Sequence, residues 1–190
     1  MTQLPIQHDR TEVIPSPKAI QLGERVYNYL ITWLPSHHVR QLFLRLLGVS
    51  IGRRSSIMMG TTILGARFLT IGDAVSIGGR CLLDARGGIT IDDDVVIASD
   101  VQIITGKHLV NSPDFDIRLG PVRIKHHAWV ASRSMVLQEL TIGVGGVVAA
   151  CSMVTQDVAD MQIVGGAPAK PIGTRESTLD YHPVFRPILT

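Results

Sequence analysis

The sequence predicts an all-β solenoid: a parallel β-helix of about five coils with an N-terminal helical cap and a C-terminal irregular arm. Three observations lead to this fold. An aliphatic residue recurs every six positions, the interruptions of that period recur once per three hexapeptides, and aromatic residues make up only 5% of the chain. An aliphatic core suits short stacked strands better than an aromatic-rich sandwich does. The 190 residues, 45% of them hydrophobic, suffice for one folded unit with a small appendage.

The hexapeptide period begins at residue 51. A period of six with three rungs per turn describes a triangular prism, in which each rung is a short parallel strand with one aliphatic side chain pointing to the axis. Small residues at the fifth position, such as Ser55 and Ala128, indicate tight corners. Glycines such as Gly72 and Gly78 follow the aliphatic residue, where backbone freedom helps the chain to turn. The fifteen aliphatic positions are Ile51, Ile57, Ile63, Ile71, Ile77, Leu83, Ile91, Ile97, Ile103, Ile124, Val130, Val136, Ile142, Val148 and Val154.

The interruptions of this period fall after the third hexapeptide of a triplet. They are Leu69-Thr70, Ile89-Thr90 and the long stretch 109–123. Because insertions that recur once per turn line up, all of them are expected on one corner of the prism. We therefore predict a β-helix over residues 51–160, with its active-site loop at 106–123.

The flanking segments complete the predicted organisation. Residues 1–50 are expected to form a tail, over 1–17, and a helical cap, with helices over 18–47 that are separated at Pro35-Ser36 and terminated at Gly48. A solenoid needs its open end covered, so a cap is preferred to a membrane-surface helix. Residues 161–190 leave the repeat at Gly-Gly-Ala-Pro and are expected to form the irregular arm.

Composition argues against several functional classes. The net charge of +2, without a basic run, argues against a nucleic-acid partner. Cys81 and Cys151 are too far apart for a disulfide framework; we interpret both as packing residues of a protein in a reducing cytoplasm. The N-terminus has no secretory pattern, and the apolar stretch 26–35 is too short for a transmembrane segment.

His108 is the candidate catalytic residue, because it stands at the mouth of the long loop. A neutral imidazole accepts a proton from a hydroxyl near neutral pH, and functional residues concentrate on loops held by rigid scaffolds. The alternative is a solvated loop histidine. Several acids could orient the imidazole. Asp84, on the preceding coil near the same edge, is ranked first, and Asp114 and Asp116 lie in the loop itself.

No metal site is predicted. His126 and His127 are taken as neighbours on a strand that point to opposite faces, and no second histidine is spaced to join His108. The run Asp92–Asp94 is taken as a solvated turn. Lys170 and Arg175 are two cations just beyond the last coil that could meet the phosphates of a nucleotide-like cofactor. The absence of a phosphate-binding glycine loop argues against ATP and NAD.

Three segments carry a family resemblance: DARGGITIDDDVVIASDVQIITGKH, PVRIKHHAWVAS and VVAACSMVTQDVADMQIVGGAPAKPIGTR. They resemble the hexapeptide-repeat acyltransferases, in particular the sugar O-acetyltransferases related to the colanic acid, nodulation-factor, galactoside and maltose enzymes. The resemblance implies a left-handed helix and a homotrimer with active sites between subunits. It also implies acetyl-CoA as acyl donor and a sugar or glycan hydroxyl as acceptor. His108 matches the family's catalytic histidine, which acts as the general base.

The resemblance further implies roles for individual residues. Asp114 and Arg118, in the loop, would bind the acceptor. The sequence departs from the family at Gln156, where a lysine is common, and at Cys151, where glycine is usual, which lowers the expected affinity for the cofactor. Serine or antibiotic acetylation, a non-catalytic trimeric scaffold and a zinc carbonic anhydrase-like enzyme are the alternatives. The residues expected to line the acetyl-CoA site are Trp129, Ala131, Ala150, Thr155, Gln156, Lys170 and Arg175.

Overall fold

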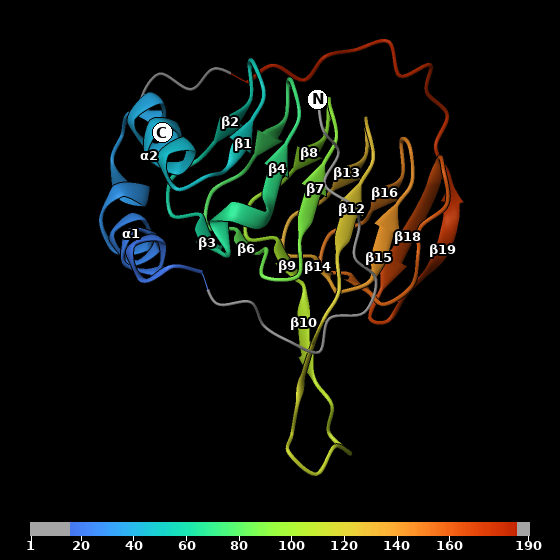
Figure 1. Cartoon of the computed structure of the whole chain (residues 1–190). Helices are drawn as coiled ribbons and strands as arrows, with labels where there is room; N and C mark the ends of the chain where they lie inside the picture. Colours follow the sequence, from blue (N-terminus) through green and yellow to red (C-terminus); the bar gives the residue numbers. More distant parts are fainter. Residues whose placement is uncertain (1–15, 186–190) are drawn as a thin grey trace.

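The computed structural model describes residues 16–185 and is a parallel β-solenoid with helices at one end (Figure 1). The predicted tail at residues 1–17 lies almost wholly outside the described residues. The helical elements are α1 (Lys18–Tyr29), η1 (Ile31–Trp33), α2 (His37–Leu46) and η2 (Ala66–Phe68).

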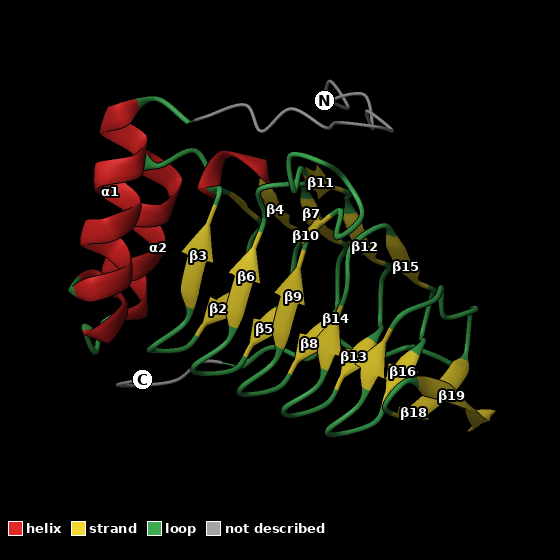
Figure 2. Cartoon of the chain, turned by 90° about the horizontal axis from the view of Figure 1, so that it is seen from below, coloured by secondary structure: helices red, strands yellow, loops and turns green. Residues whose placement is uncertain are grey.

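Three sheets form the sides of the prism, and Figure 2 shows their strands stacked along its length. The first sheet contains β1 (Ser50–Ile51), β4 (Leu69–Ile71), β7 (Ile89–Ile91), β12 (Val122–Ile124) and β15 (Leu140–Ile142). The second contains β2 (Ser56–Ile57), β5 (Ser76–Ile77), β8 (Val96–Ile97), β13 (Trp129–Val130), β16 (Val147–Val148), β18 (Gln162–Gly166) and β19 (Ala169–Thr174). The third contains β3 (Thr62–Leu64), β6 (Leu82–Asp84), β9 (Gln102–Ile104), β14 (Met135–Val136) and β17 (Met153–Val154).

The predicted aliphatic residues form one column per sheet. In the third sheet, for example, Ile63 pairs with Leu83, Leu83 with Ile103, and Val136 with both Ile103 and Val154. These side chains are almost completely shielded from solvent. The hexapeptide period therefore predicted both the register and the core, because one side chain of each rung points to the axis.

Removing one methylene from a column tests this core. Ile103→Val is expected to lower the free energy of unfolding by about 0.5–1.5 kcal/mol, because Ile103 is completely buried and the prism cannot close around the lost group. The matched control is Ile172→Val, at a residue 64% exposed, which should change it by less than about 0.5 kcal/mol. Urea unfolding followed by circular dichroism measures both; equal effects would mean that Ile103 does not lie in the core.

Three corners connect the sheets. The first corner links the first sheet to the second (92–95 and its equivalents), the second corner links the second sheet to the third (131–134 and equivalents), and the third corner links the third sheet back to the first (85–88, 105–121 and equivalents). The long insertion lies at the third corner, as predicted. The small corner residues are buried, which also agrees with the prediction: Ser55, Thr61, Cys81, Ala128, Ser134 and Ser152.

The glycines that follow the aliphatic residues serve a different purpose from the one expected. A Cβ at Gly72 would lie 2.3 Å from Oδ1 of Asp93, and a Cβ at Gly78 would lie 2.4 Å from the backbone nitrogen of Ser99. Close stacking of the next coil therefore excludes a side chain at these positions. The left-handed conformation is adopted instead by corner residues such as Ala74, Asp94 and His127.

The N-terminal helices cap the open end of the solenoid through hydrogen bonds as well as apolar contacts. Nδ2 of Asn28 donates to the Ile63 carbonyl at 2.8 Å, and the Ile63 N–H donates to Oδ1 of Asn28 at 2.9 Å. The buried Arg40 guanidinium donates to the carbonyl of Ile57 at 2.9 Å. Each of the three sheets thus receives hydrogen bonds from the cap at this edge, which would otherwise expose unpaired strand groups. Further bonds reach the carbonyls of Thr61 from Thr32, of Ser55 from Gln41, and of Ile51 from Arg45.

The far end extends beyond the predicted five coils. The second sheet has six parallel strands, the last being β18, and the first sheet continues as a single bridge between Ile142 and Val158. The described solenoid therefore has about six turns. β18 folds back on β19 as an antiparallel hairpin, so the first part of the predicted irregular arm is ordered sheet. The segment after Thr174 has no helix or strand up to residue 185.

Candidate active site

The long insertion is a β-hairpin rather than an irregular loop. Its strands are β10 (Gly106–His108) and β11 (Ile117–Leu119), which pair antiparallel with His108 opposite Ile117. Figure 1 shows the hairpin projecting away from the prism. It carries His108 out beyond the third corner.

The hydrogen bonding of His108 defines the role of each ring nitrogen. Nδ1 lies 2.9 Å from the carbonyl oxygen of Phe115, and the Phe115 ring stacks on the imidazole with centroids 4.2 Å apart. A carbonyl oxygen only accepts hydrogen bonds, so Nδ1 must carry the hydrogen. In the neutral ring, Nε2 then has the free lone pair that can accept a proton.

Asp84 is not the residue that orients His108 within one chain. Its carboxylate forms a two-pronged pair with Arg86, with Nε–Oδ1 at 2.8 Å and Nη2–Oδ2 at 2.7 Å. This hydrogen bond to the carboxylate raises the pKa of the Arg86 guanidinium. The backbone carbonyl of Asp84 accepts from the Thr105 hydroxyl at 2.6 Å, and the Thr105 carbonyl accepts from the N–H of Gly120 at 2.9 Å. Asp84 therefore helps to anchor the root of the hairpin, while the Phe115 carbonyl orients the imidazole.

The two residues expected to bind the acceptor occupy different parts of the hairpin. Nε of Arg118 donates to Glu139 at 2.7 Å, and Nζ of Lys107 lies 4.0 Å from the same carboxylate. Arg118 thus holds the hairpin to the next coil. Asp114 is exposed near the tip, next to Phe115.

A hollow of about 450 Å³ lies beside His108, and all its lining residues come from the stretch 107–112. One arm of the hairpin therefore supplies its only wall among the described residues. The apolar side chains of Val110 and Phe115 are 76% and 55% exposed on the same hairpin. Large apolar groups exposed around a one-sided hollow are typical of a surface that another chain covers.

The residues expected to bind acetyl-CoA are divided among the edges of the prism. Ala131 and Ala150 lie in successive turns of the second corner. The Gly166 N–H donates to the Ser152 hydroxyl at 3.1 Å, which places the turn before Lys170 against the same corner. Ala131 and Ala150 therefore lie at the second corner, and Lys170 follows the turn that packs against it. Trp129 is exposed on the second sheet, and Thr155 and Gln156 are exposed at the third corner.

Arg175 does not join these residues. Its guanidinium donates to the carbonyls of His127 at 2.8 Å and Gly145 at 3.2 Å, and it also contacts Tyr181. It thus fastens the C-terminal segment to the first corner.

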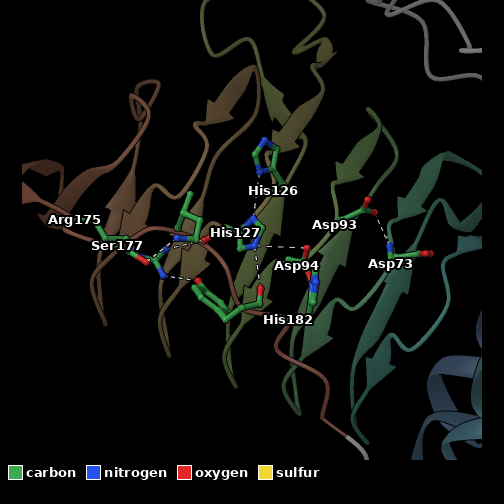
Figure 3. A network of polar contacts seen from close by, with 10 residues as sticks. Asp73, Asp93, Asp94, His126, His127, Arg175, Ser177 and His182 are labelled. Carbon is green, nitrogen blue, oxygen red and sulfur yellow. Dashed lines mark hydrogen bonds and ion pairs between the residues drawn. The ribbon is translucent and has the colours of Figure 1, made fainter.

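Figure 3 shows a cluster of polar side chains at the first corner, which the sequence did not predict. Asp94 is 7% exposed; it lies 2.7 Å from Nδ1 of His182 and 3.6 Å from Nε2 of His127. The expectation of a solvated Asp92–Asp94 turn is therefore wrong for Asp94. His126 and His127 lie in a turn rather than on a strand, and their Nδ1 atoms are 3.3 Å apart, so they do not point to opposite faces.

Two features are absent from the part of the chain that the structure describes. Between residues 16 and 185, no three His, Cys, Asp or Glu side chains are grouped so as to hold a metal ion. Over the same range, no helix has the length and apolar character needed to cross a membrane.

Comparison with known proteins places the chain in a family. The chain is 32% identical over 161 residues to WcaF of Escherichia coli, named as a colanic acid biosynthesis acetyltransferase, covering 84% of this chain and 88% of that protein. The chain belongs to the hexapeptide-repeat acetyltransferases. The predicted fold family and the prediction of an acyltransferase are thereby confirmed. No family model matches the chain.

Two further relatives of this hexapeptide-repeat family inform the chemistry. The structure of the acetyltransferase VCA0836 of Vibrio cholerae in complex with acetyl-CoA matches with a TM-score of 0.77 and 26% identity, covering 84% of this chain and 89% of that one. The dTDP-4-amino-4,6-dideoxy-D-glucose acyltransferase of Escherichia coli is 28% identical over 73% of this chain and 88% of its own length. The first agrees with the predicted acyl donor.

Proposed function

We propose that this acetyltransferase moves an acetyl group from acetyl-CoA to a hydroxyl of a sugar or glycan, with His108 as general base. The observation that carries this proposal is the contact between Nδ1 of His108 and the Phe115 carbonyl. It leaves Nε2 as a proton acceptor on an exposed hairpin beside a hollow. Sugar hydroxyls are the acceptor class of choice because WcaF is named for the biosynthesis of a polysaccharide, colanic acid.

The proposed reaction uses Nε2 twice. Nε2 accepts the proton of the acceptor hydroxyl as the hydroxyl oxygen bonds to the thioester carbonyl carbon. The tetrahedral intermediate then collapses with cleavage of the carbon–sulfur bond, and the imidazolium returns the proton to the departing thiolate. One hydroxyl and one thioester thus become one ester and one free thiol.

The active site is proposed to form between subunits of a homotrimer. Ala131 and Ala150 lie at the second corner, and the turn before Lys170 packs against the same corner, whereas His108 stands on the hairpin of the third corner. The residues of one subunit that are expected to bind acetyl-CoA would therefore lie next to His108 of a neighbouring subunit. The one-sided hollow at residues 107–112 and the exposed apolar tip of the hairpin support this arrangement.

N-acylation of an amino sugar is the second candidate function. The relative that acylates dTDP-4-amino-4,6-dideoxy-D-glucose favours it. The same base would then remove a proton from the attacking nitrogen. The two candidates differ in the bond formed, an ester or an amide.

Thiol release measures the proposed activity. The protein is incubated with acetyl-CoA and, in turn, oligosaccharides, nucleotide sugars, amino sugars, serine and chloramphenicol, and free CoA thiol is followed with a chromogenic disulfide. Release that depends on a hydroxyl sugar is expected. Release that depends only on serine, chloramphenicol or an amino sugar would exclude the sugar O-acetyltransferase. No thiol release that depends on any acceptor, together with no measurable binding of acetyl-CoA, would exclude acetyl transfer altogether.

Cysteine alkylation tests where acetyl-CoA binds. Burial raises the pKa of the Cys81 thiol to about 11, whereas Cys151 is exposed at the second corner next to Ala150. Iodoacetamide at pH 8 is expected to label Cys151 and spare Cys81, because the buried thiol is protonated and shielded. Saturating acetyl-CoA should slow the labelling of Cys151 at least fivefold. Mass spectrometry of peptides gives both rates; unchanged labelling of Cys151 with acetyl-CoA bound would place the donor elsewhere.

A further inference from the structure

The N-terminal cap has a second apolar face, which points away from the solenoid. Nine large hydrophobic side chains are more than half exposed among residues 16–185, and six of them lie between residues 22 and 46. Figure 2 shows α1 and α2 standing at one end of the prism, where only one side of each helix can contact the first coil. The six residues are Leu22, Tyr29, Leu30, Trp33, Leu42 and Leu46. Trp33 lies at the border of this face, because a Cβ at Gly60 of the first coil would lie 2.9 Å from its ring.

Their spacing makes each face continuous along its helix. Leu22 and Tyr29 are seven residues apart on α1, and Val39, Leu42 and Leu46 follow an i, i+3, i+7 pattern on α2. Residues at this spacing lie on one side of a helix. The opposite side of α2 carries the buried residues Arg40 and Leu44. Capping therefore accounts for one side of the helices and leaves the outer side unexplained.

Charge around this end of the molecule is strongly one-sided. Residues 16–72 contain seven Lys and Arg, of which Arg40 is buried, and one acid, Glu24, although the whole chain has 18 basic and 16 acidic residues. The next acid, Asp73, accepts from the Arg53 N–H at 2.7 Å. The carboxylate of Glu24 accepts a hydrogen bond from the Ala66 N–H at 2.8 Å. Lys18, Arg25 and Arg45 are exposed on the two helices.

We propose that the outer face of the cap docks on the surface of an anionic lipid bilayer. An apolar helix face rimmed by cations is the arrangement that binds at the headgroup boundary, and Tyr and Trp side chains such as Tyr29 and Trp33 favour that depth. α1 has 12 residues and α2 has 10, too few to cross a bilayer, so the helices lie on the surface.

The same charges disfavour the main alternative, a second copy of this chain. An isologous contact between two caps would bring two cationic rims together with one acid on each side. An anionic lipid surface compensates these cations. The proposal does not depend on the reaction catalysed, and its test needs no activity measurement.

Co-sedimentation with vesicles tests the docking. The probes are vesicles of phosphatidylcholine alone and of phosphatidylcholine with about one third phosphatidylglycerol. The protein is expected to bind the anionic vesicles at least tenfold more strongly, and binding should fall sharply between 0.1 M and 1 M NaCl, where the Debye length shrinks from about 10 Å to about 3 Å. Absence of binding to anionic vesicles at low salt would overturn the proposal.

Paired variants locate the binding surface. Lys18→Gln with Arg25→Gln should weaken binding about 25-fold, since each cation near an anionic surface contributes about fivefold. Leu42→Ser with Leu46→Ser should weaken it at least tenfold. The matched controls, Arg133→Gln and Ile172→Ser, change an exposed cation and an exposed apolar residue of the solenoid and should bind as the wild type does. Equal losses in the control variants would overturn the proposal.

Two further measurements separate the other occupants of this face. Tryptophan emission should shift to the blue on anionic vesicles, and the shift should be lost in Trp33→Phe, which keeps the apolar surface. Light scattering without lipid should give the same mass for the wild type and for the Leu42→Ser, Leu46→Ser variant. A smaller mass for the variant would show that a second copy covers the face. Vesicle binding that appears only after removal of residues 1–15 would show that those residues cover it; either result would overturn the proposal.

Discussion

Replacing His108 with alanine is expected to lower kcat for acetyl transfer by about 10²–10⁴-fold, the usual contribution of a positioned general base. Nε2 is the proton acceptor of the proposed reaction, and no other imidazole of the described chain stands on this hairpin. Neither KM for acetyl-CoA nor the circular dichroism spectrum should change, because His108 is an exposed side chain outside the core. Steady-state thiol release measures kcat and KM together.

His126→Ala is the matched control for this variant. His126 is also an exposed histidine, but it lies at the first corner of the prism. The activity of the His126→Ala variant should stay within about twofold of the wild type. Full activity in His108→Ala, or an equal loss in His126→Ala, would show that His108 is not the base.

Replacing Arg40 with alanine should produce the largest loss of stability. The guanidinium is completely buried beneath α2 and donates to the carbonyls of Ile57 and Leu34. Burial lowers the pKa of Arg40 from its ordinary value. The buried Ile57 carbonyl and the partly buried Leu34 carbonyl would lose a charged donor, which costs about 3–5 kcal/mol in free energy of unfolding.

Arg45→Ala on the same helix is the control for Arg40. Arg45 is exposed and donates to Gln41 at 3.2 Å and to the Ile51 carbonyl at 3.1 Å, so water can replace it at a cost below about 1 kcal/mol. Urea unfolding compares the two variants. Similar losses would mean that the buried guanidinium does not hold the cap to the solenoid.

The periodic part of the fold could be predicted because each rung contributes one side chain to the axis. The column from Ile63 to Val154 has the predicted register, and the phase slips identified the corner from which the hairpin projects. The hand of the helix could not be obtained in this way. A period of six residues is the same for either hand, and only the resemblance to the family implied a left-handed coil.

The sixth turn was missed because the period changes there. Val158 follows Val154 after four residues, and its strand is reduced to a single bridge with Ile142. β18 and β19 pair antiparallel across the Gly-Gly-Ala-Pro turn, which in the sequence resembles the end of ordered structure. A pattern search for parallel rungs cannot detect a strand pair of the opposite orientation.

The candidate site was predicted in position better than in its contacts. The sequence located His108 at the elongated corner but ranked Asp84 as its partner. The carboxylate of Asp84 instead pairs with the guanidinium of Arg86, two residues further along the chain. The pairing of Asp94 with His182 joins residues 88 positions apart through the path of the C-terminal segment. No repeat or local motif encodes that path.

The bond formed in the product tests the proposed function most directly. The acceptor found by thiol release is incubated with acetyl-CoA and either wild type or His108→Ala, and the product is analysed by mass spectrometry before and after mild alkali. The wild type is expected to add one acetyl group that alkali removes, as an ester requires, and His108→Ala to add little or none. An alkali-stable acetyl group, or equal product from the variant, would contradict O-acetylation with His108 as base.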